Sequence, residues 1–183
     1  GAFFLQKSDI PAKIGSTGKA LHHTRFLIVD DNSAPVPAGE KGEIWMRGPN
    51  ITKGYWNRPE ANEKSFQGGW LKSGDIGRMD EDGYIYIEDR VKDMYISGGE
   101  NVYPAEVENA LYELEEIAEV AVIGVPDSKW GEVGCAVVAL KPGQALTMSE
   151  IAAHCETRLA KYKHPTFLAV VDALPRNTMG KVQ

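Results

Sequence analysis

Residues 87–107, IEDRVKDMYISGGENVYPAEV, decide the fold because the pattern of the chain changes inside this stretch. A basic cluster and a short apolar run come first, and the glycine pair Gly98 and Gly99 follows. Pro104 then stands where a helix would begin. Two adjacent glycines between a strand and a helix allow positive φ angles and a close approach to a ligand. A solvated hairpin followed by a tight turn explains the same residues equally well.

Composition limits the classes of protein that the chain can belong to. Its 183 residues suffice for one domain or two small ones, and 43% hydrophobic and 25% charged residues are typical of a globular chain. A net charge of −6 argues against a general nucleic-acid or anionic-membrane surface. No apolar run approaches the roughly 20 residues of a membrane helix. No signal peptide opens the chain, so we expect a cytoplasmic protein without a transmembrane segment.

Cysteine and histidine give no sign of a metal site. Cys135 and Cys155 lack metal or redox spacing, and both lie in apolar segments. We therefore expect buried free thiols in a reducing compartment. The four histidines show no ligand spacing, so no metal ligands are expected within this chain.

The first half of the chain has the pattern of a small antiparallel sheet or barrel. RFLIVD at 25–30 and EIWMR at 43–47 are predicted strands, separated by a loop rich in glycine and proline. A helix is predicted before Phe66, with Pro59 in its first turn. A hairpin turn at residues 80–83 leads into a further strand.

Two charged residues in turn-rich surroundings are candidates for binding a ligand. Asp75 stands beside a glycine at an expected strand end or loop, where its carboxylate could accept hydrogen bonds from two adjacent hydroxyls. An aspartate that only holds its own turn is the simpler explanation. Lys181 follows a glycine in the polar tail LPRNTMGKVQ, and a lysine is a mobile cation suited to an anion. A solvated lysine is the ordinary alternative.

The second half has the pattern of a separate α+β unit. A helix is predicted over residues 104–114 because apolar residues recur there at helical spacing. Strands are predicted at 117–125, 134–140 and 167–171, the first of them ended by Pro126. Thr147 and Glu150 form a capping box for a second helix. We place a domain boundary near residues 89–92, between a β-rich domain at 1–91 and an α+β domain at 92–183.

Five stretches together resemble one family in their order and spacing. They are RGPNITKGYWNRPEA, LKSGDIG, DGYIYIEDRVKDMYISGGENVYPAEVE, VIGVPDSKWGE and LPRNTMGK. They are similar to the C-terminal part of the AMP-forming acyl-CoA synthetases, in the adenylate-forming superfamily shared with firefly luciferase. The resemblance covers nearly the whole chain. It implies the end of a large N-terminal domain, with a small antiparallel β-barrel subdomain, followed by a small mobile C-terminal α+β domain.

The resemblance also implies roles for individual residues. Asp75 and Arg90 match the residues that contact the ribose of AMP, and Lys92 matches the hinge about which the small domain turns. Lys181 matches the catalytic lysine that reaches the acyl carboxylate and phosphate during adenylation. The loop that lines the pantetheine tunnel of the second half-reaction is matched by Gly98, Gly99 and Glu100.

The implied activity is that of an ATP-dependent acyl-CoA synthetase of the fatty-acid–CoA ligase type, with a carboxylic acid, ATP and CoA as substrates. The family's phosphate-binding loop and its Tyr-Gly-x-Thr-Glu segment have no counterpart here, so the ligands of Mg²⁺ are expected in a missing N-terminal domain. We therefore expect a fragment without turnover of its own. An aryl-CoA ligase, an adenylation domain or acyl-AMP ligase that loads a carrier protein, and a non-enzymatic docking module are alternatives.

Overall fold

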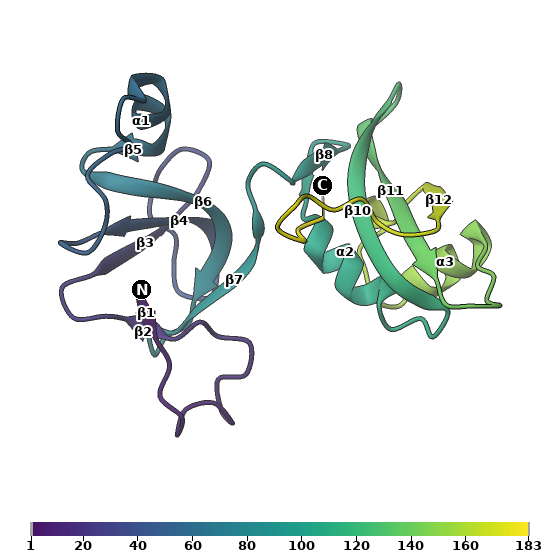
Figure 1. Ribbon diagram of the computed structural model, residues 1–183, viewed down its shortest axis with the longest axis horizontal. Coiled ribbons are helices and arrows are strands. Elements are labelled where there is room, and N and C mark those ends of the chain that lie inside the picture. The colour runs from purple at the N-terminus through teal and green to yellow at the C-terminus, as the bar shows by residue number, and fades with distance from the viewer. Residues whose placement is uncertain (1, 183) are drawn as a thin grey trace. The chain divides into compact units, whose positions relative to one another are not determined.

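A computed structural model gives the fold and describes residues 2–182. The chain divides into two compact units, Gly1–Lys92 and Asp93–Gln183. Figure 1 shows that both consist mainly of β-sheet with few helices, which confirms the α+β class. Within residues 2–182, no helix is both long enough and apolar enough to cross a membrane.

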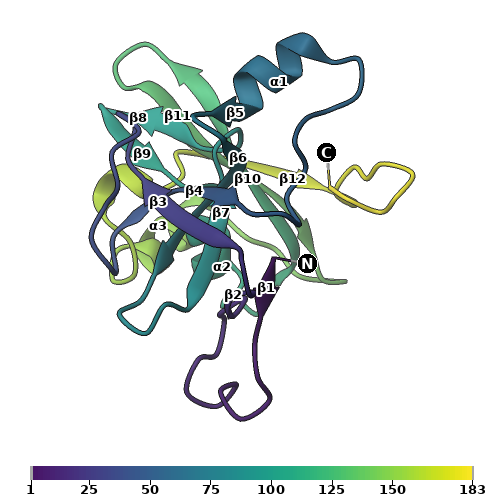
Figure 2. The ribbon, with the colours of Figure 1, turned by 90° about the vertical axis from the view of Figure 1, so that its left-hand side faces the viewer.

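A five-stranded antiparallel sheet forms the first unit, in the order β3-β4-β6-β5 with β7 beside β6. A two-stranded sheet of β1 and β2 precedes it, and α1 lies against β5 and β6 (Figure 2). The bounds are β1 Phe3–Phe4, β2 Lys19–Ala20, β3 Arg25–Val29, β4 Lys41–Arg47, α1 Pro59–Ser65, β5 Phe66–Gln67, β6 Trp70–Met79 and β7 Ile85–Arg90.

Apolar side chains from several strands hold this sheet together. Ile28, Ile44 and Ile85 come from three different strands and form the buried core of the unit. Phe3 and Phe26 stack against each other beside that core, with ring centroids 4.6 Å apart. The predicted strands and the predicted helix beginning at Pro59 are confirmed.

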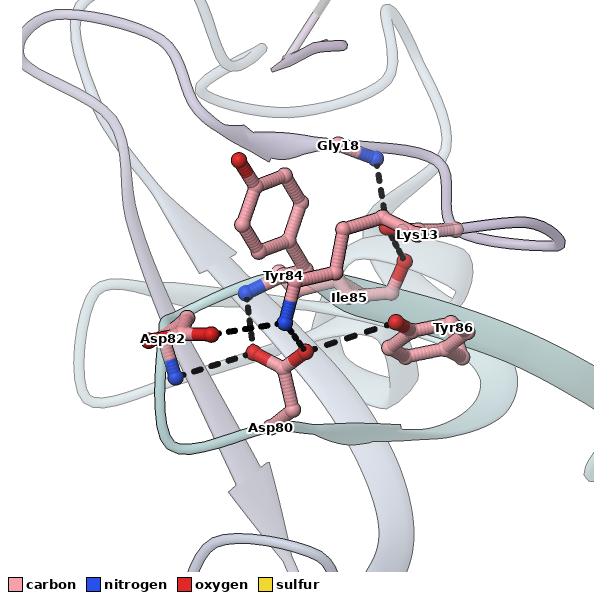
Figure 3. A network of polar contacts seen from close by, with 8 residues as sticks. Lys13, Gly18, Asp80, Asp82, Tyr84, Ile85 and Tyr86 are labelled. Carbon is pink, nitrogen blue, oxygen red and sulfur yellow. Dashed lines mark hydrogen bonds and ion pairs between the residues drawn. The ribbon is translucent and has the colours of Figure 1, made fainter. Parts of the chain in front are cut away.

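The β6–β7 hairpin is tied to the loop between β1 and β2 by Lys13 (Figure 3). The Lys13 ammonium group lies 2.7 Å from a carboxylate oxygen of Asp80 and 2.7 Å from one of Asp82. The other Asp80 oxygen accepts hydrogen bonds from the backbone N–H groups of Asp82 (3.0 Å) and Tyr84 (2.9 Å). Burial acts to raise the pKa of Asp80, but Lys13 and the Tyr84 backbone hold that pKa below its ordinary value. The turn end of the hairpin is therefore fixed.

The position of Asp75 differs from the expectation. Asp75 lies within β6, so the prediction of a strand end or loop is wrong. Glu43 and Trp45 of β4 pair with Ile76 and Lys72, which leaves extra residues of β6 in a bulge. Gly74 has a φ of +72° there, and this left-handed conformation lets the strand continue past the irregularity.

The second unit contains a sheet in the order β10-β11-β8-β9, with β12 parallel beside β11. Residues of α2, α3, β10 and β11 meet in one core around Leu111, Val138 and Ile151. The bounds are β8 Tyr95–Ser97, β9 Glu100–Val102, α2 Pro104–Leu111, β10 Ile117–Asp127, β11 Gly131–Leu140, α3 Met148–Cys155, the 3₁₀ helix η1 Lys161–Lys163 and β12 Phe167–Val171.

Helix and strand ends in this unit follow local chemistry. The predicted capping box is confirmed: Thr147 Oγ1 accepts from the Glu150 N–H at 3.3 Å, and Glu150 accepts from the Thr147 N–H at 2.8 Å. The helix predicted to reach residue 114 ends at Leu111 instead. The strand predicted to stop before Pro126 continues to Asp127. An edge strand tolerates this proline, and β10 pairs only with β11 among the described strands.

Candidate functional site

Asp75 and Arg90 form a pair on the first unit. They are cross-strand partners on β6 and β7, and the Arg90 Nε donates a hydrogen bond to Asp75 Oδ1 at 3.0 Å. The side chain of Asp75 is 27% exposed and that of Arg90 is 53% exposed. The structure therefore places these two predicted residues together, at the surface of their unit.

The bulge that carries Asp75 is held by Glu43, which sequence reasoning missed. One Glu43 carboxylate oxygen accepts from the Trp45 indole N–H at 2.8 Å. The other accepts from the Gly74 backbone N–H at 3.2 Å. The Asp75 N–H donates to Ser73 Oγ at 3.0 Å. Nothing in the sequence marked Glu43 beyond its place in a strand, because its contact with Gly74 spans 31 positions.

This pair has the chemistry needed to hold a diol. Asp75 Oδ1 accepts the hydrogen bond from Arg90, whereas Asp75 Oδ2 has no hydrogen-bond partner among residues 2–182. An ionised carboxylate accepts strong hydrogen bonds from hydroxyls, and a guanidinium beside it supplies further donors. Asp75 and Arg90 therefore suit a ribose.

Lys181 lies on the second unit in a loop closed by backbone contacts. Arg176 and Val182 form an isolated β-bridge, and Asn177 and Lys181 are joined by a backbone hydrogen bond of 2.8 Å. Lys181 is exposed. None of the residues that the structure describes pairs with its ammonium group, which is therefore available to an anion.

Gly98 and Gly99 form the turn of the β8–β9 hairpin. Their φ angles are +63° and +89°, and Ser97 pairs with Glu100 across them. These positive angles match a two-residue hairpin turn, so the glycine pair is the turn of a hairpin and not a tight turn that follows one. The expectation that the glycines lie directly between a strand and a helix is wrong, because β9 intervenes before α2.

Trp130 packs beside this turn. The Gly98 N–H donates to the Trp130 carbonyl at 2.9 Å. A Cβ on Gly98 would lie 2.9 Å from the Trp130 ring, so a side chain there would force the ring to shift. Gly98, Gly99 and Glu100 are all exposed.

A cavity of about 490 Å³ adjoins the turn and was not foreseen from the sequence. Trp130 and Tyr162 offer aromatic faces, and Lys161 offers a cation. The aromatic and basic run KYKH at 161–164 was the available signal. Ser97, which precedes the turn, also lines the cavity. Such a lining suits a ligand with a flat ring and negative charge.

Lys92 is the last residue of the first unit and lies in the exposed turn between β7 and β8. Asp75 and Arg90 therefore belong to one unit, whereas Lys181 and the glycine turn belong to the other.

No cluster of three or more His, Cys, Asp or Glu side chains suited to a metal ion occurs in residues 2–182. Both cysteines are free thiols. Cys155 is buried as expected, whereas Cys135 is only half-buried because it lies on a sheet strand next to exposed Phe167. Burial raises the pKa of both thiols.

Comparison with known families agrees with these features. Residues 106–181 match the AMP-binding enzyme C-terminal domain, and residues 1–56 match the AMP-binding enzyme family. The chain belongs to the AMP-binding, adenylate-forming enzymes. The resemblance stated from the motifs is thereby confirmed.

Relatives of this AMP-binding enzyme chain include CoA ligases for different acids. A feruloyl-CoA synthase of an Amycolatopsis species is 48% identical over 182 residues, which are 100% of this chain and 37% of the relative. A long-chain-fatty-acid–CoA ligase of Mycobacterium tuberculosis is 44% identical, over 100% of this chain and 36% of the relative. The chain thus spans little more than a third of the curated relatives that it matches.

Solved structures agree with the fold. The o-succinylbenzoate CoA synthetase of Bacillus subtilis, in complex with its acyl-adenylate intermediate, superposes with a TM-score of 0.89 at 44% identity, over 99% of this chain and 37% of that chain. The same synthetase in complex with ATP and magnesium ion gives a TM-score of 0.87 at 42% identity, again over 99% of this chain and 37% of that one.

Proposed function

We propose that this chain is part of an ATP-dependent acyl-CoA synthetase. In the parent enzyme, the carboxylate attacks the α-phosphate of ATP to form an acyl-adenylate with release of pyrophosphate, and the acyl group then passes to the thiol of CoA with release of AMP. The observation that carries the proposal is the match, along 99% of the chain, to a CoA synthetase bound to an acyl-adenylate.

Asp75 and Arg90 are proposed to bind the ribose of ATP and AMP. The free oxygen of Asp75 and the neighbouring guanidinium supply an acceptor and donors for adjacent hydroxyls. Their place on paired strands, with the turn end of the hairpin fixed by Lys13, supports a preformed site.

Lys181 is proposed to neutralise the charge that develops when the substrate carboxylate attacks the α-phosphate. Its exposed ammonium group, without a partner among the described residues, supports this role. Lys92 is proposed as the hinge between the two units, because a short junction can absorb a change in backbone angles.

The glycine turn at 98–99, with Glu100, is proposed to line the passage of the pantetheine arm. The adjoining cavity, with Trp130, Tyr162 and Lys161, suits the adenine ring and phosphates of CoA. Residues 2–182 contain no cluster of three or more side chains suited to a metal ion, and the ligands of Mg²⁺ are proposed to lie in the remainder of the parent.

An aryl acid is a second candidate substrate class, because the feruloyl-CoA synthase is 48% identical to this chain and the fatty-acid–CoA ligase is 44% identical. A panel of aryl and alkyl acids in an assay of acid-dependent pyrophosphate release separates the two classes. Formation of acyl-CoA rather than loading of a carrier protein identifies the acceptor.

The test of the proposed function uses the full-length parent. Lys181→Ala should lower acid-dependent pyrophosphate release by roughly 10²–10³-fold, as expected for the loss of one transition-state contact. Conversion of a supplied acyl-adenylate to acyl-CoA should change little. Lys141→Ala is the matched control, because this exposed lysine donates to the Glu115 carbonyl instead. Equal loss of both half-reactions would contradict the role of Lys181.

A further inference from the structure

Glu119 of β10 holds the segment that leads to Lys181 at two points. One carboxylate oxygen accepts a hydrogen bond from Arg176 Nη2 at 2.7 Å. The other accepts from the Leu174 backbone N–H at 3.4 Å. Leu174 itself is buried, with 5% exposure. The start of the tail is therefore fixed to the sheet by two polar contacts, one on each side of Pro175.

Arg176 links Glu119 to the loop that leads to Lys181. While its Nη2 pairs with Glu119, its Nη1 donates to the Gly180 carbonyl at 2.9 Å. Gly180 directly precedes Lys181 and has a φ of +78°. One planar guanidinium thus joins the sheet to the residue before the lysine, a geometry that a lysine ammonium cannot reproduce.

Asn177 closes the same loop from within. Its side-chain oxygen accepts from the backbone N–H groups of Met179 (2.9 Å) and Lys181 (3.0 Å). Backbone hydrogen bonds from Asn177 to Lys181 (2.8 Å) and from Gly180 to Asn177 (2.9 Å) close the loop as well, but its side chains add little, since Thr178 is exposed and Met179 is 77% exposed. An exposed loop is mobile unless contacts tie it down.

We propose that Glu119 is a positioning residue for adenylation, which acts through Arg176 to hold the Lys181 loop in one conformation. The inference rests on the proposed function of Lys181. A lysine on an ordered loop reaches its anion with less loss of conformational freedom than one on a flexible loop. Because Glu119 acts through its contacts with Arg176 and Leu174, its effect is confined to the half-reaction that uses Lys181.

The experiment compares Glu119→Ala with Glu119→Gln in the full-length parent. Alanine removes both contacts, whereas glutamine keeps a neutral acceptor. We expect pyrophosphate release to fall about 10-fold for alanine and less for glutamine, with acyl transfer from supplied acyl-adenylate within twofold of wild type. Glu115→Gln, an exposed glutamate of the same unit, is the control. In a Lys181→Ala background, Glu119→Ala should cause no further loss.

Hydrogen–deuterium exchange of residues 176–182 gives a readout that does not depend on activity. Glu119→Ala should raise exchange there at least several-fold, with an unchanged melting temperature as the check on folding. Unchanged exchange, or equal impairment of both half-reactions, would overturn the positioning role. If the wild-type parent releases no pyrophosphate with any acid, the proposed function fails, and the exchange data still decide whether Glu119 orders the loop.

Discussion

Asp75 offers the sharpest test of nucleotide binding by a single side chain. Asp75→Asn keeps the shape but removes the charge that strengthens its hydrogen bonds, and hydrogen bonds to charged groups contribute about 1.5–3 kcal/mol. We expect AMP binding by the full-length parent to weaken by roughly 10- to 100-fold, measured by calorimetry. Asp31→Asn, an exposed aspartate of the β3–β4 loop, should leave binding unchanged. Unaltered affinity in Asp75→Asn would remove Asp75 from the site.

Tyr95 gives a prediction about stability and pH. Its side chain is 2% exposed, and its hydroxyl has no hydrogen-bond partner within residues 2–182. Burial, followed by the nearby Glu132 carboxylate, raises the pKa of Tyr95 from 10.0 to about 12. Between these values the unfolded chain loses the proton while the folded chain keeps it, so stability falls as the pH rises.

The expected fall in the free energy of unfolding is about 2–3 kcal/mol across this interval, and it should be absent in Tyr95→Phe. At neutral pH the substitution should be neutral or stabilising, because it removes an unpaired buried hydroxyl. Denaturant unfolding from pH 7 to 12 measures both effects. An identical slope with pH in the two proteins would contradict the assigned pKa.

Residue roles were predictable from the sequence only where a motif carried them. The resemblance to a family identified Asp75, Arg90 and Lys181. The structure adds the contact between Asp75 and Arg90, which arises because the two residues are partners in the register of β6 and β7. Glu43 and Glu119 could not be found in this way. Their partners lie 31 and 57 positions away, and only the folded sheets bring them together.

At the scale of elements, Tyr95 also fixes how β8 packs on the long β10–β11 pair. Gly124 and Gly134 are partners across that pair, and both face Tyr95. A Cβ on Gly134 would lie 2.5 Å from the Tyr95 hydroxyl oxygen, whereas its other neighbours are no closer than 3.4 Å. A Cβ on Gly124 would instead meet the Tyr95 Cβ. A side chain at Gly134 would therefore clash with the Tyr95 hydroxyl, whereas one at Gly124 would clash with the Tyr95 Cβ.

This difference predicts a selective rescue. Gly134→Ala should destabilise the chain by about 1–3 kcal/mol through overpacking, and Tyr95→Phe should recover most of that loss because it removes the obstructing oxygen. Gly124→Ala should also destabilise, but Tyr95→Phe should not rescue it, since phenylalanine keeps the Cβ. Thermal unfolding of the single and double variants measures the coupling. Rescue of both glycine variants, or of neither, would contradict this packing.

Elements with strong local signals were predictable, and their irregularities were not. The capping box of α3 and the proline at the start of α1 are local features, so the sequence located both helices. The β6 bulge and the passage of β10 through Pro126 depend on neighbouring strands. The glycine turn was ambiguous because the pairing of β8 with β9 involves only a few residues, too few to give a periodic pattern.

For the molecule as a whole, the sequence predicted two domains. The pattern of apolar residues is that of strands before residue 92 and that of mixed helices and strands after it. The structure divides after Lys92, one residue later than the predicted limit of the first domain. Each unit has its own core, around Ile44 in one and around Leu111 in the other. The role of Lys92 as a hinge stays a prediction, because it concerns a motion.

Lys92→Pro tests that role directly. Proline fixes its own φ near −65° and restricts the preceding residue, so a junction that must change its backbone angles would be confined to one conformation. In the full-length parent we expect one half-reaction to stay within a few-fold of wild type, while the other falls by at least 10-fold. Pyrophosphate release and acyl transfer from supplied acyl-adenylate are measured separately. Lys92→Ala controls for the side chain, because it keeps the backbone free, and both rates should then stay near wild type. A proline variant with both half-reactions intact would show that the enzyme works without rotation at this residue.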